Sequence, residues 1–445
     1  MHHGAKEKAL HGILAAEAEP AVFDKTPKIT LTGQGRGGPA EIGIPPEVLA
    51  KSILFLGASQ SGKTNVMKTV MEQVFDQLGP DDTALVLDSK LDFITLFRRP
   101  GDVVMGIDLP DRKGVRQNLY REVTADGNDP ENIRNNAAMI ADRLFVDMEK
   151  TSQPFFPLAA KRLLGSFLNL GAGIAAGDPK KANFYHNRSL RNFFTKGGPA
   201  ALRRFMKAAE NGGELHSYLG DMTSNQALGV LGELNASLSR FLQGPWSEEG
   251  GFSLREFIRR RGGKVLYLHY PLKDGPSRAE LYGLQLDLAL RELLSHPEQE
   301  PRGKVYIFLD ELALLGKGAP EMLKTAVNYG ISQGLGGVFV GIQSVAQLVE
   351  LYGEAGADSL LAGFGSVIAF RPNDPHTMRM IQERAGTVDA MLTVPTTAAA
   401  HREVRQTQVA KEWDLRRLDV GQALVCLVNK PPFYFQFDKF KKKED

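Results

Sequence analysis

"FLGASQSGKTNV", residues 55–66, decides the fold class of this chain. The stretch fits the pattern G-x-x-x-x-G-K-[ST], with Gly57 and Gly62 as its glycines and with Lys63 and Thr64 at its end. Such a loop wraps a triphosphate, because its backbone N–H groups and the N-terminus of the following helix point at phosphate oxygens. The lysine of the pattern reaches the β- and γ-phosphates, and the threonine hydroxyl holds Mg²⁺. We therefore expect a nucleotide site formed by Gly57, Ala58, Ser59, Gln60, Ser61, Gly62, Lys63, Thr64 and Asn65.

The flanking sequence has the context that such a loop needs. "SILFLG", from Ser52, is an apolar run of strand length, and "TNVMKTVMEQVF", from Thr64, has apolar residues at helical spacing. A strand, a glycine loop and a helix in this order make the pattern specific. "TALVLDSK" predicts a second strand that ends at Asp88, and "DVVMGIDL" predicts a third. Asp88 either contacts water at the phosphate site or, as is commoner, forms the turn after its strand.

A second stretch, "VYIFLDEL" at 305–312, ends an apolar strand on two adjacent acids. Since α/β sheets bind ligands at the carboxyl ends of their strands, we expect Asp310 to hold Mg²⁺ through its water shell. Glu311 would polarise the attacking water. The alternative is a strand end with two solvated acids.

The following predicted strand, "GGVFVGIQS", ends at Gln343. Its amide either senses the γ-phosphate or caps the next helix, and the sequence leaves both possibilities open. The candidate catalytic residues are therefore Glu311, Lys63 and Gln343, and the candidate Mg²⁺ ligands are Thr64 and Asp310.

The order of predicted elements divides the chain into four segments. Residues 1–47 are a polar leader with one strand, "KITLTG", and a glycine-rich link, "GQGRGGPAEIGIPPE". Residues 48–124 are the first part of a nucleotide-binding domain, residues 125–245 an all-α domain, and residues 246–445 the second part of the nucleotide-binding domain. Strands alternate with helices outside the helical segment, which indicates an α/β fold with a mostly parallel sheet covered on both faces.

Composition is that of an ordinary globular protein, with 42% apolar and 24% charged residues. The 54 basic and 52 acidic residues nearly balance, so DNA contacts would come from local basic stretches such as "ALRRFMK" and "EFIRRRGGK". More often such charges are the solvated face of a helix. The single cysteine, Cys426, excludes an internal disulfide and a cysteine-based zinc cluster. We expect it to be a small core residue.

Neither a membrane span nor a secretory signal is apparent in the sequence. No stretch approaches the roughly 18 consecutive apolar residues that a spanning helix needs. The N-terminus also lacks the charged, apolar and small-residue layout of a secretory signal. We therefore expect a cytoplasmic protein without a transmembrane helix.

Several stretches together resemble the conjugative coupling proteins of type IV secretion, the TraG/TraD class, which are related to FtsK/HerA-type DNA translocases. They are "SILFLGASQSGKT", "LVLDSKLDFITLF", "SQPFFPLAAKRLL" and, most specifically, the block from "YIFLDELALLGKG" to "GIQSVAQLVELYG". The similarity extends from about residue 40 to the C-terminus. Members of the family are ring-forming ATPases at the cytoplasmic side of the inner membrane. They recruit the relaxase-bound plasmid strand and help to pump it through the secretion channel.

The resemblance implies a RecA-like P-loop NTPase core with an inserted all-α domain, a homo-hexamer, and ATP with Mg²⁺ bound between subunits. As partners it implies DNA, single-stranded and with its relaxase, and either components of the secretion channel or a separate membrane anchor. It also implies a peripheral location at the inner membrane. The resemblance assigns phosphate and Mg²⁺ binding to Gly57, Gly62, Lys63 and Thr64, Mg²⁺ and water to Asp310 and Glu311, and a sensor role to Gln343.

Three features depart from the family pattern. The membrane-spanning helices with which members usually begin are not found in this sequence. "GISQG" places Ile331 where many members have an arginine that reaches a neighbour's phosphate, and Arg371 and Arg379 are candidates to replace it. Such an arginine is worth a factor of about 10³ or more in phosphoryl transfer. Leu312 replaces the usual aromatic residue after the acid pair.

The leading hypothesis from the sequence is thus an ATP-driven DNA pump of the coupling class. One alternative is a chromosome or repair translocase of the FtsK/HerA type, although no DNA-reading winged helix follows the last predicted strands. The other is a recruitment adaptor with a structural nucleotide site, which agrees with Ile331 and the missing anchor.

Overall fold

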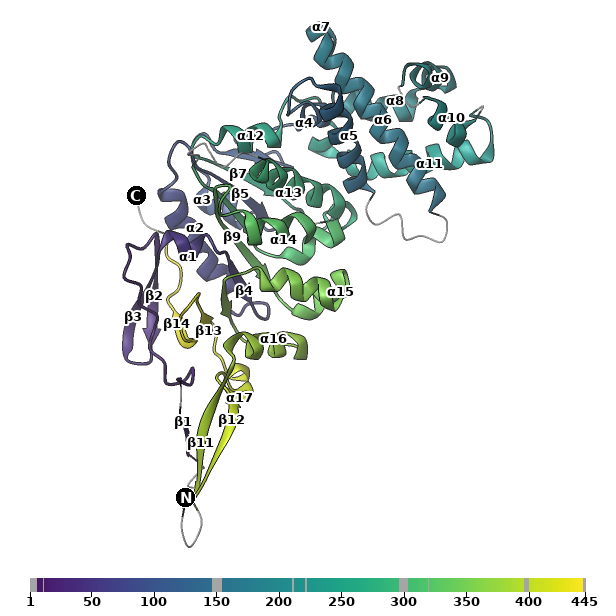
Figure 1. The fold of residues 1–445 in the computed structure, drawn as a ribbon. Helices are drawn as coiled ribbons and strands as arrows, with labels where there is room; N and C mark the ends of the chain where they lie inside the picture. Colours follow the sequence, from purple (N-terminus) through teal and green to yellow (C-terminus); the bar gives the residue numbers. More distant parts are fainter. Residues whose placement is uncertain are drawn as a thin grey trace. The chain divides into compact units, whose positions relative to one another are not determined.

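The computed structural model describes residues 6–10, 12–145, 154–209, 212–220, 222–295, 303–318, 320–395 and 400–442. The chain divides into two compact units, and Figure 1 shows their secondary structure. Unit 1 comprises Met1–Gly79, Lys304–Ala313 and Lys324–Asp445. Unit 2 comprises Pro80–Gly303 and Leu314–Leu323. The four-segment domain division made from the sequence stays a prediction.

Unit 1 is built on a mixed sheet with the strand order β3-β2-β14-β13-β10-β4-β9-β8. The pairs from β10 to β8 are parallel and the remaining pairs are antiparallel. The parallel strands are buried along their whole length, which explains their continuous apolar sequences. The strand bounds are β2 (Ile29–Gly35), β3 (Gly38–Ile44), β4 (Ile53–Leu56), β8 (Val305–Leu309), β9 (Leu335–Ile342), β10 (Ser366–Ala369), β13 (Gln422–Cys426) and β14 (Phe433–Phe437).

Helices cover both faces of this sheet, with α2 on one face and α15 and α16 on the other (Figure 1). The ring of Phe75, near the end of α2, meets the ring of Phe308 edge to face at 5.5 Å, and Phe308 stacks on Phe339 at 4.5 Å. These contacts fix α2 against β8 and β9. The bounds are α1 (Pro46–Leu49), α2 (Lys63–Asp76), α14 (Pro320–Tyr329), α15 (Val345–Ala362), α16 (Pro375–Ala385) and α17 (Glu412–Arg416).

The predicted glycine-rich link is wrong over most of its length, because its first three residues end strand β2 and Gly38–Ile44 forms strand β3. It pairs with β2 in an antiparallel hairpin from Ile29↔Ile44 to Gly35↔Gly38. Ile42 and Ile44 alternate with outward residues and are fully buried. The two buried isoleucines lie among glycines, which have a low strand propensity. The strand was therefore not recognised in the sequence. The hairpin joins β14, so strands from near the two ends of the chain lie side by side.

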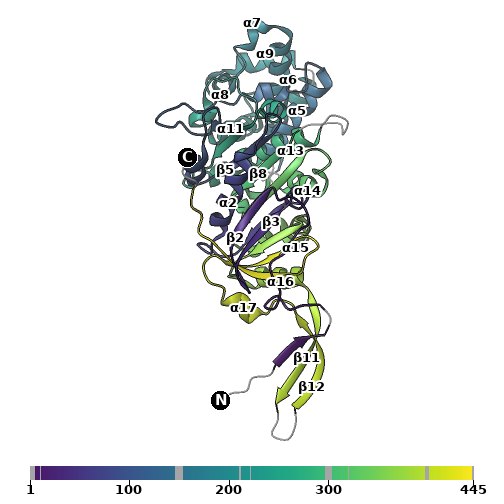
Figure 2. The same cartoon turned by 90° about the vertical axis from the view of Figure 1, so that its left-hand side faces the viewer.

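A second sheet, with the order β1-β11-β12, was not predicted. Figure 2 shows it as a twisted ribbon of β1 (Lys6–Ala9), β11 (Thr387–Pro395) and β12 (Ala400–Gln408). β11 and β12 pair antiparallel along nine positions, from Thr387↔Gln408 to Pro395↔Ala400. The residues of β12 from Arg402 to Gln406 are all exposed, so this strand has no apolar alternation that could reveal it.

Unit 2 contains three parallel strands in the order β5-β7-β6, namely β5 (Thr83–Asp88), β6 (Val103–Met105) and β7 (Lys264–His269). From α5 to α11, the described residues form helices and no strand, as the helical spacing predicted. The helices are α3 (Asp92–Phe97), α4 (Leu119–Val123), α5 (Pro130–Leu144), α6 (Phe155–Gly177), α7 (Pro179–Ala182), α8 (Asn187–Lys196), α9 (Pro199–Ala208), α10 (Gly212–Leu219), α11 (Asn225–Phe241), α12 (Leu254–Arg260) and α13 (Ala279–Leu294). Short 3-10 turns are η2 (Gly244–Ser247), η3 (Pro276–Arg278) and η4 (Leu312–Gly318).

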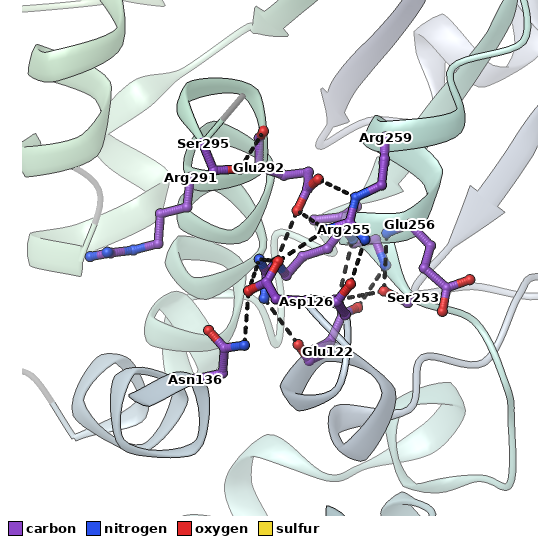
Figure 3. Close-up of polar contacts among 12 residues, drawn as sticks. Glu122, Asp126, Asn136, Ser253, Arg255, Glu256, Arg259, Arg291, Glu292 and Ser295 are labelled. Carbon is purple, nitrogen blue, oxygen red and sulfur yellow. Dashed lines mark hydrogen bonds and ion pairs between the residues drawn. The ribbon is translucent and has the colours of Figure 1, made fainter. Parts of the chain in front are cut away.

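A network of charged side chains in unit 2 connects α12 and α13 with the segment before α5 (Figure 3). Arg255 of α12, with a side chain only 5% exposed, forms ion pairs with Asp126 at 2.6 Å and with Glu292 of α13 at 3.2 Å. Asp126 also accepts a hydrogen bond from Asn136 of α5 at 3.0 Å. The network therefore joins three helices to the segment that precedes α5.

Glu122 of α4 completes this network as the cap of α12. It is fully buried, and its carboxylate accepts hydrogen bonds from the backbone N–H groups of Leu254 and Arg255 and from the hydroxyl of Ser253. Two of the donors are backbone N–H groups at the start of a helix, which have no partner inside the helix. Both oxygens of this buried carboxylate accept hydrogen bonds, so we assign Glu122 a structural role.

The expectation that Cys426 is a small core residue is met in the structure. Cys426 is buried in β13, where burial raises the pKa of its thiol to about 12. Among the described residues, no helix combines the length and the hydropathy that crossing a membrane requires.

Candidate nucleotide-binding site

The loop between β4 and α2 has the conformation that only glycine allows at two positions. Gly57 has φ 145° and Gly62, which precedes the first residue of α2, has φ 119°. A Cβ on Gly57 would lie 2.8 Å from Cβ of Phe370, and a Cβ on Gly62 would lie 2.9 Å from Cα of Gly421. The glycines of the sequence pattern are therefore required by both backbone conformation and space.

Neighbouring segments of unit 1 hold the loop by main-chain hydrogen bonds. The N–H of Gly57 donates to the carbonyl of Ile342 at 3.2 Å, and the N–H of Ala58 donates to the carbonyl of Arg371 at 3.0 Å. The N–H of Gly421 donates to the carbonyl of Ser61 at 2.9 Å. Sequence reasoning missed Gly421, because a lone glycine before a predicted strand signals a turn but not its partner.

Lys63 lies inside the loop rather than in solvent. It is 7% exposed, and its Nζ donates to the carbonyl oxygens of Gly57 at 2.5 Å and Ala58 at 2.9 Å. The ammonium group is thus a buried positive charge at the N-terminus of α2, where the helix dipole adds to it. This combination attracts the charged phosphates of a nucleotide.

The structure brings the two sequence motifs together. Thr64 Oγ1 donates a 2.8 Å hydrogen bond to Oδ1 of Asp310, which follows the last residue of β8. Hydroxyl and carboxylate oxygens are the ligands that Mg²⁺ prefers, and this ion usually keeps several waters and takes only one or two protein ligands besides phosphate oxygens. Thr64 and Asp310 therefore fit a Mg²⁺ site.

Glu311 has an environment that suits a proton acceptor. Burial raises the pKa of its carboxyl to about 7, with a further rise from Asp310, while Lys63 and a hydrogen bond with the side chain of Gln343 lower it. Its Oε1 is buried and has no hydrogen-bond partner among the described residues. A buried carboxylate oxygen without a partner is costly, so such an oxygen indicates a place for a hydrogen-bond donor.

The remaining loop residues divide between solvent and structure. Ser59 and Gln60 are exposed, whereas Ser61 is buried and its Oγ has no partner among the described residues. The side-chain amide of Asn65 donates to the carbonyl of Asp438 at 2.9 Å and accepts from the N–H of Phe440 at 2.7 Å. Asn65 thus ties the C-terminal segment to α2, while its own N–H remains part of the helix N-terminus.

Other candidates from the sequence fall outside this cluster. Asp88 accepts hydrogen bonds from the N–H groups of Lys90, Phe93 and Ile94, which confirms that it forms the turn before α3. Arg379 pairs with Glu354 at 3.4 Å on the surface. The side chain of Ile331 is 39% exposed. The catalytic, nucleotide-binding and metal-binding roles of the site residues stay predictions.

Comparisons with known proteins agree with this fold. The chain aligns with the solved structure of the bacterial conjugative coupling protein TrwBdeltaN70 with a TM-score of 0.73 and 21% identity, over 95% of this chain and 92% of that one. The plasmid coupling protein TrwB in complex with ADP and Mg²⁺ gives a TM-score of 0.69 at 21% identity, over 90% and 88% of the two chains. VirB4 of Thermoanaerobacter pseudethanolicus gives 0.55 at 13% identity, over 94% and 99%. These similarities establish the fold, a mixed α/β fold with a mostly parallel sheet and an all-α part.

A comparison with curated protein sequences gives no match. The family model described as the DNA-binding domain of type IV secretion-system coupling proteins matches residues 38–418, which covers most of the chain. The matched range includes the phosphate loop, the acid pair after β8 and every helix from α5 to α11. The chain therefore belongs to the family of type IV secretion-system coupling proteins.

Proposed function

We propose that this chain is an ATPase that binds ATP with Mg²⁺ at the phosphate loop and uses hydrolysis to move single-stranded DNA. Relaxase-bound DNA would be recruited and pumped into a type IV secretion channel during conjugation. The observation that carries the proposal is the 2.8 Å contact between Thr64 and Asp310, next to Glu311, whose Oε1 is buried and whose carboxylate contacts Gln343. Family membership supports DNA as the partner.

Each side chain has a defined role in the proposed hydrolysis. Lys63, released from the carbonyls of Gly57 and Ala58, binds the β- and γ-phosphates. Glu311 accepts a proton from the attacking water, for which a pKa of about 7 is well matched to neutral pH. Gln343 holds the Glu311 carboxylate and so connects the state of the γ-phosphate to β9. Mg²⁺ held by Thr64 and Asp310 would neutralise charge on the phosphate oxygens.

The assembly we propose is a homo-hexamer with nucleotide between subunits, peripheral at the inner membrane through channel components or a separate anchor. Ile331 stands where many family members have an arginine, so a neighbour would have to supply another cation. Arg371 is the better candidate, because its side chain is exposed. Arg379 is engaged with Glu354.

Steady-state and single-turnover ATPase assays with and without single-stranded DNA test this function. We expect Glu311→Gln to bind a fluorescent ATP analogue like the wild type but to lower turnover by about 10² or more. Lys63→Ala should lose binding itself. Glu383→Gln, an exposed residue of α16, is the matched control and should keep both activities.

Two outcomes would favour the alternatives. Nucleotide binding without DNA-stimulated turnover would indicate a recruitment adaptor, which the apolar Ile331 favours. Stimulation by double-stranded but not single-stranded DNA would indicate a translocase of the FtsK/HerA type.

A further inference from the structure

Residues 370–374, which follow β10, contact both the phosphate loop and the end of β9 in unit 1. The first two of them support the loop. Phe370 is fully buried and leaves no room for a Cβ on Gly57, which would lie 2.8 Å from the Cβ of Phe370. The carbonyl of Arg371 accepts the 3.0 Å hydrogen bond from the N–H of Ala58. Close packing and a hydrogen bond thus fix this end of the segment against the loop.

The last two residues of the same segment hold the backbone just after β9. In the amide orientation that satisfies its neighbours, the side-chain nitrogen of Asn373 donates to the carbonyl of Gln343 at 3.2 Å and to Oδ2 of Asp374 at 3.1 Å. The hydroxyl of Ser344 donates to the same Oδ2 at 2.7 Å. Ser344 is buried, so water competes little for this hydrogen bond. The segment that supports the phosphate loop therefore also supports Gln343 and Ser344.

Asp374 also joins the starts of two helices on one face of the sheet, α15 and α16 (Figure 1). It is the N-cap of α16, where its Oδ1 accepts from the N–H of Thr377 at 3.0 Å. Ser344 is the N-cap of α15 and accepts from the N–H of Ala346 at 3.1 Å. Thr377 is fully buried, donates its hydroxyl to Asp374 and accepts from the N–H of Val345 at 2.8 Å. Capping of α16 requires only the first of these contacts, so the others indicate a second role.

The carboxyl group of Asp374 is ionised at neutral pH. Burial raises its pKa, but hydrogen bonds from Thr377 and Ser344 outweigh this effect and hold the pKa below its ordinary value. Hydrogen bonds to an ionised acceptor are stronger than those between neutral groups. Asp374 is therefore a firm point of attachment for Ser344.

The position of Gln343 matters because its side chain contacts the carboxylate of Glu311. The pairing of β4 with β9 ends at Leu56↔Ile342, one residue before Gln343. Support for Gln343 beyond this point comes from the hydrogen bonds of residues 373 and 374. A displacement of about 1 Å at a reacting centre can lower a rate by about 10². Small shifts of these supporting residues should therefore affect the site without unfolding it.

We propose that Asp374, together with Asn373, is a positioning residue that holds Gln343 at a fixed place relative to the phosphate loop. The inference rests on the role of Gln343 in the proposed function. Asp374 acts through Gln343 and contacts neither the nucleotide nor the attacking water. Its loss should leave the binding of ADP intact, because the loop and Lys63 remain. The same loss should weaken the binding of a nucleotide with a γ-phosphate, because Gln343 is displaced.

Nucleotide affinities of the full chain test the proposal without requiring turnover. The probes are ADP and the non-hydrolysable ATP analogue with an imido group between the β- and γ-phosphates, each with Mg²⁺ and in competition with a fluorescent nucleotide. Gln343→Ala gives the reference effect, and we expect it to lower the ratio of analogue affinity to ADP affinity about fivefold, the effect of one net hydrogen bond. Asp374→Ala, Asn373→Ala and Ser344→Ala should lower the ratio by a similar factor, with an ADP affinity within about twofold of the wild type. Ser344→Thr, which keeps the hydroxyl, should retain the wild-type ratio.

A double-mutant cycle tests whether Asp374 acts through Gln343. In the wild-type background, Asp374→Ala should lower the affinity ratio and also lower kcat about tenfold. In the Gln343→Ala background, the same substitution should change neither quantity further. A residue with a merely structural role would have the same effect in both backgrounds.

Two helix caps in unit 2 provide matched controls. Asp129 is the N-cap of α5 and is followed by a proline at the first helical position, as Asp374 is in α16. Ser224 is the N-cap of α11, as Ser344 is of α15. Asp129→Ala and Ser224→Ala remove the same kind of cap elsewhere, so both should keep the wild-type affinity ratio and kcat.

The proposal is overturned if Asp374→Ala and Asn373→Ala keep the wild-type ratio, or if Asp374→Ala weakens ADP and the analogue alike. It is also overturned if Gln343→Ala keeps the wild-type ratio, or if Asp374→Ala lowers the ratio equally in both backgrounds. Failure of the proposed function has a different signature, since a wild type without turnover would still show the affinity ratio and its loss in the variants. Thermal melts check that each variant is folded. If Asp374→Ala is not, Asn373→Ala, which leaves the cap of α16 in place, decides the question.

Discussion

Thr64 Oγ1 lies 2.8 Å from Asp310 Oδ1, although 246 residues separate the two in the sequence. The sheet topology explains this proximity. β4, which leads into the phosphate loop, and β8, which ends before Asp310, flank β9 in parallel register. The carboxyl ends of all three strands therefore meet at one edge of the sheet, where α/β folds place their ligands.

Thr64→Val should abolish the dependence of ATP binding on Mg²⁺. Valine keeps the shape of threonine but loses the hydroxyl that contacts Asp310. The affinity for a fluorescent ATP analogue, measured in Mg²⁺ and in a chelator, should differ in the wild type and be the same in the variant. Thr69→Val, five residues further along α2, is the control and should keep the difference. A Mg²⁺ effect of wild-type size in Thr64→Val would remove Thr64 from the metal site.

Gly421→Ala should weaken nucleotide binding at least tenfold without unfolding the protein. Gly421 has φ 84°, and an added Cβ would lie 2.7 Å from Nε2 of Gln436. The left-handed conformation alone costs a non-glycine residue about 1 kcal/mol, and the shift would disturb the hydrogen bond to Ser61. Gly127→Ala has a similar φ of 94° with open space around it, so it controls for the backbone cost. Equal nucleotide affinities in the two variants would contradict the role of Gly421.

Asn65→Ala should release the C-terminal segment from α2 while leaving the loop in place. Both hydrogen bonds of the amide, to Asp438 and from Phe440, would be lost. Hydrogen exchange followed by mass spectrometry should show faster exchange at Phe440 by about tenfold or more, because the hydrogen bond from that N–H to Asn65 is lost. In Gln73→Ala, whose amide holds the backbone of Thr30, the increase should appear at Thr30 instead.

Asp126→Asn should destabilise unit 2 in a pH-dependent manner. Burial raises the pKa of Asp126, but hydrogen bonds from Arg255 and Asn136 and the charges of Arg255 and Arg259 outweigh it and hold the pKa below its ordinary value. A carboxyl with a lowered pKa stabilises the fold above its unfolded pKa of about 4, and this stabilisation disappears as pH falls through the folded value.

Urea unfolding between pH 3 and pH 8 measures this effect. The free energy of unfolding should differ between wild type and Asp126→Asn by on the order of 2 kcal/mol at neutral pH, since Arg255 would lose its 2.6 Å ion pair and keep the longer one with Glu292. The difference should shrink below about pH 4. Asp358→Asn, on the exposed side of α15, controls for the loss of one carboxylate. A difference that grows toward acid pH would refute this account of the network.

The sequence predicted the central strands and the loop correctly because each has a strong local signal. β4, β5, β8 and β9 are buried on both faces and are therefore continuous apolar runs. The glycines of the loop were recognisable because their backbone conformation favours glycine at a fixed spacing, although Phe370 and Gly421 also leave no room for a side chain there. The pair of acids was recognisable because it directly follows such a strand.

The unpredicted parts depend on contacts rather than on local pattern. β12 exposes every residue from Arg402 to Gln406, so its strand conformation follows from pairing with β11 and not from apolar alternation. β3 has its two buried isoleucines among glycines. The support of the loop by Gly421, and of Asn65 by Asp438 and Phe440, joins residues more than 350 positions apart. No spacing rule within a sequence reveals such partners.

The residues that hold the phosphate loop and Asn65 come late in the sequence, which has a consequence for biosynthesis. The phosphate loop leaves the ribosome early, but Gly421 and the segment at Asp438 follow some 360 residues later, which corresponds to about 20 to 70 s at ordinary rates of elongation. During that interval the nascent polypeptide carries the complete nucleotide motif without the residues that shape it. A product truncated before residue 421 would therefore contain every motif residue from Gly57 to Gln343 and still lack a preorganised phosphate cradle.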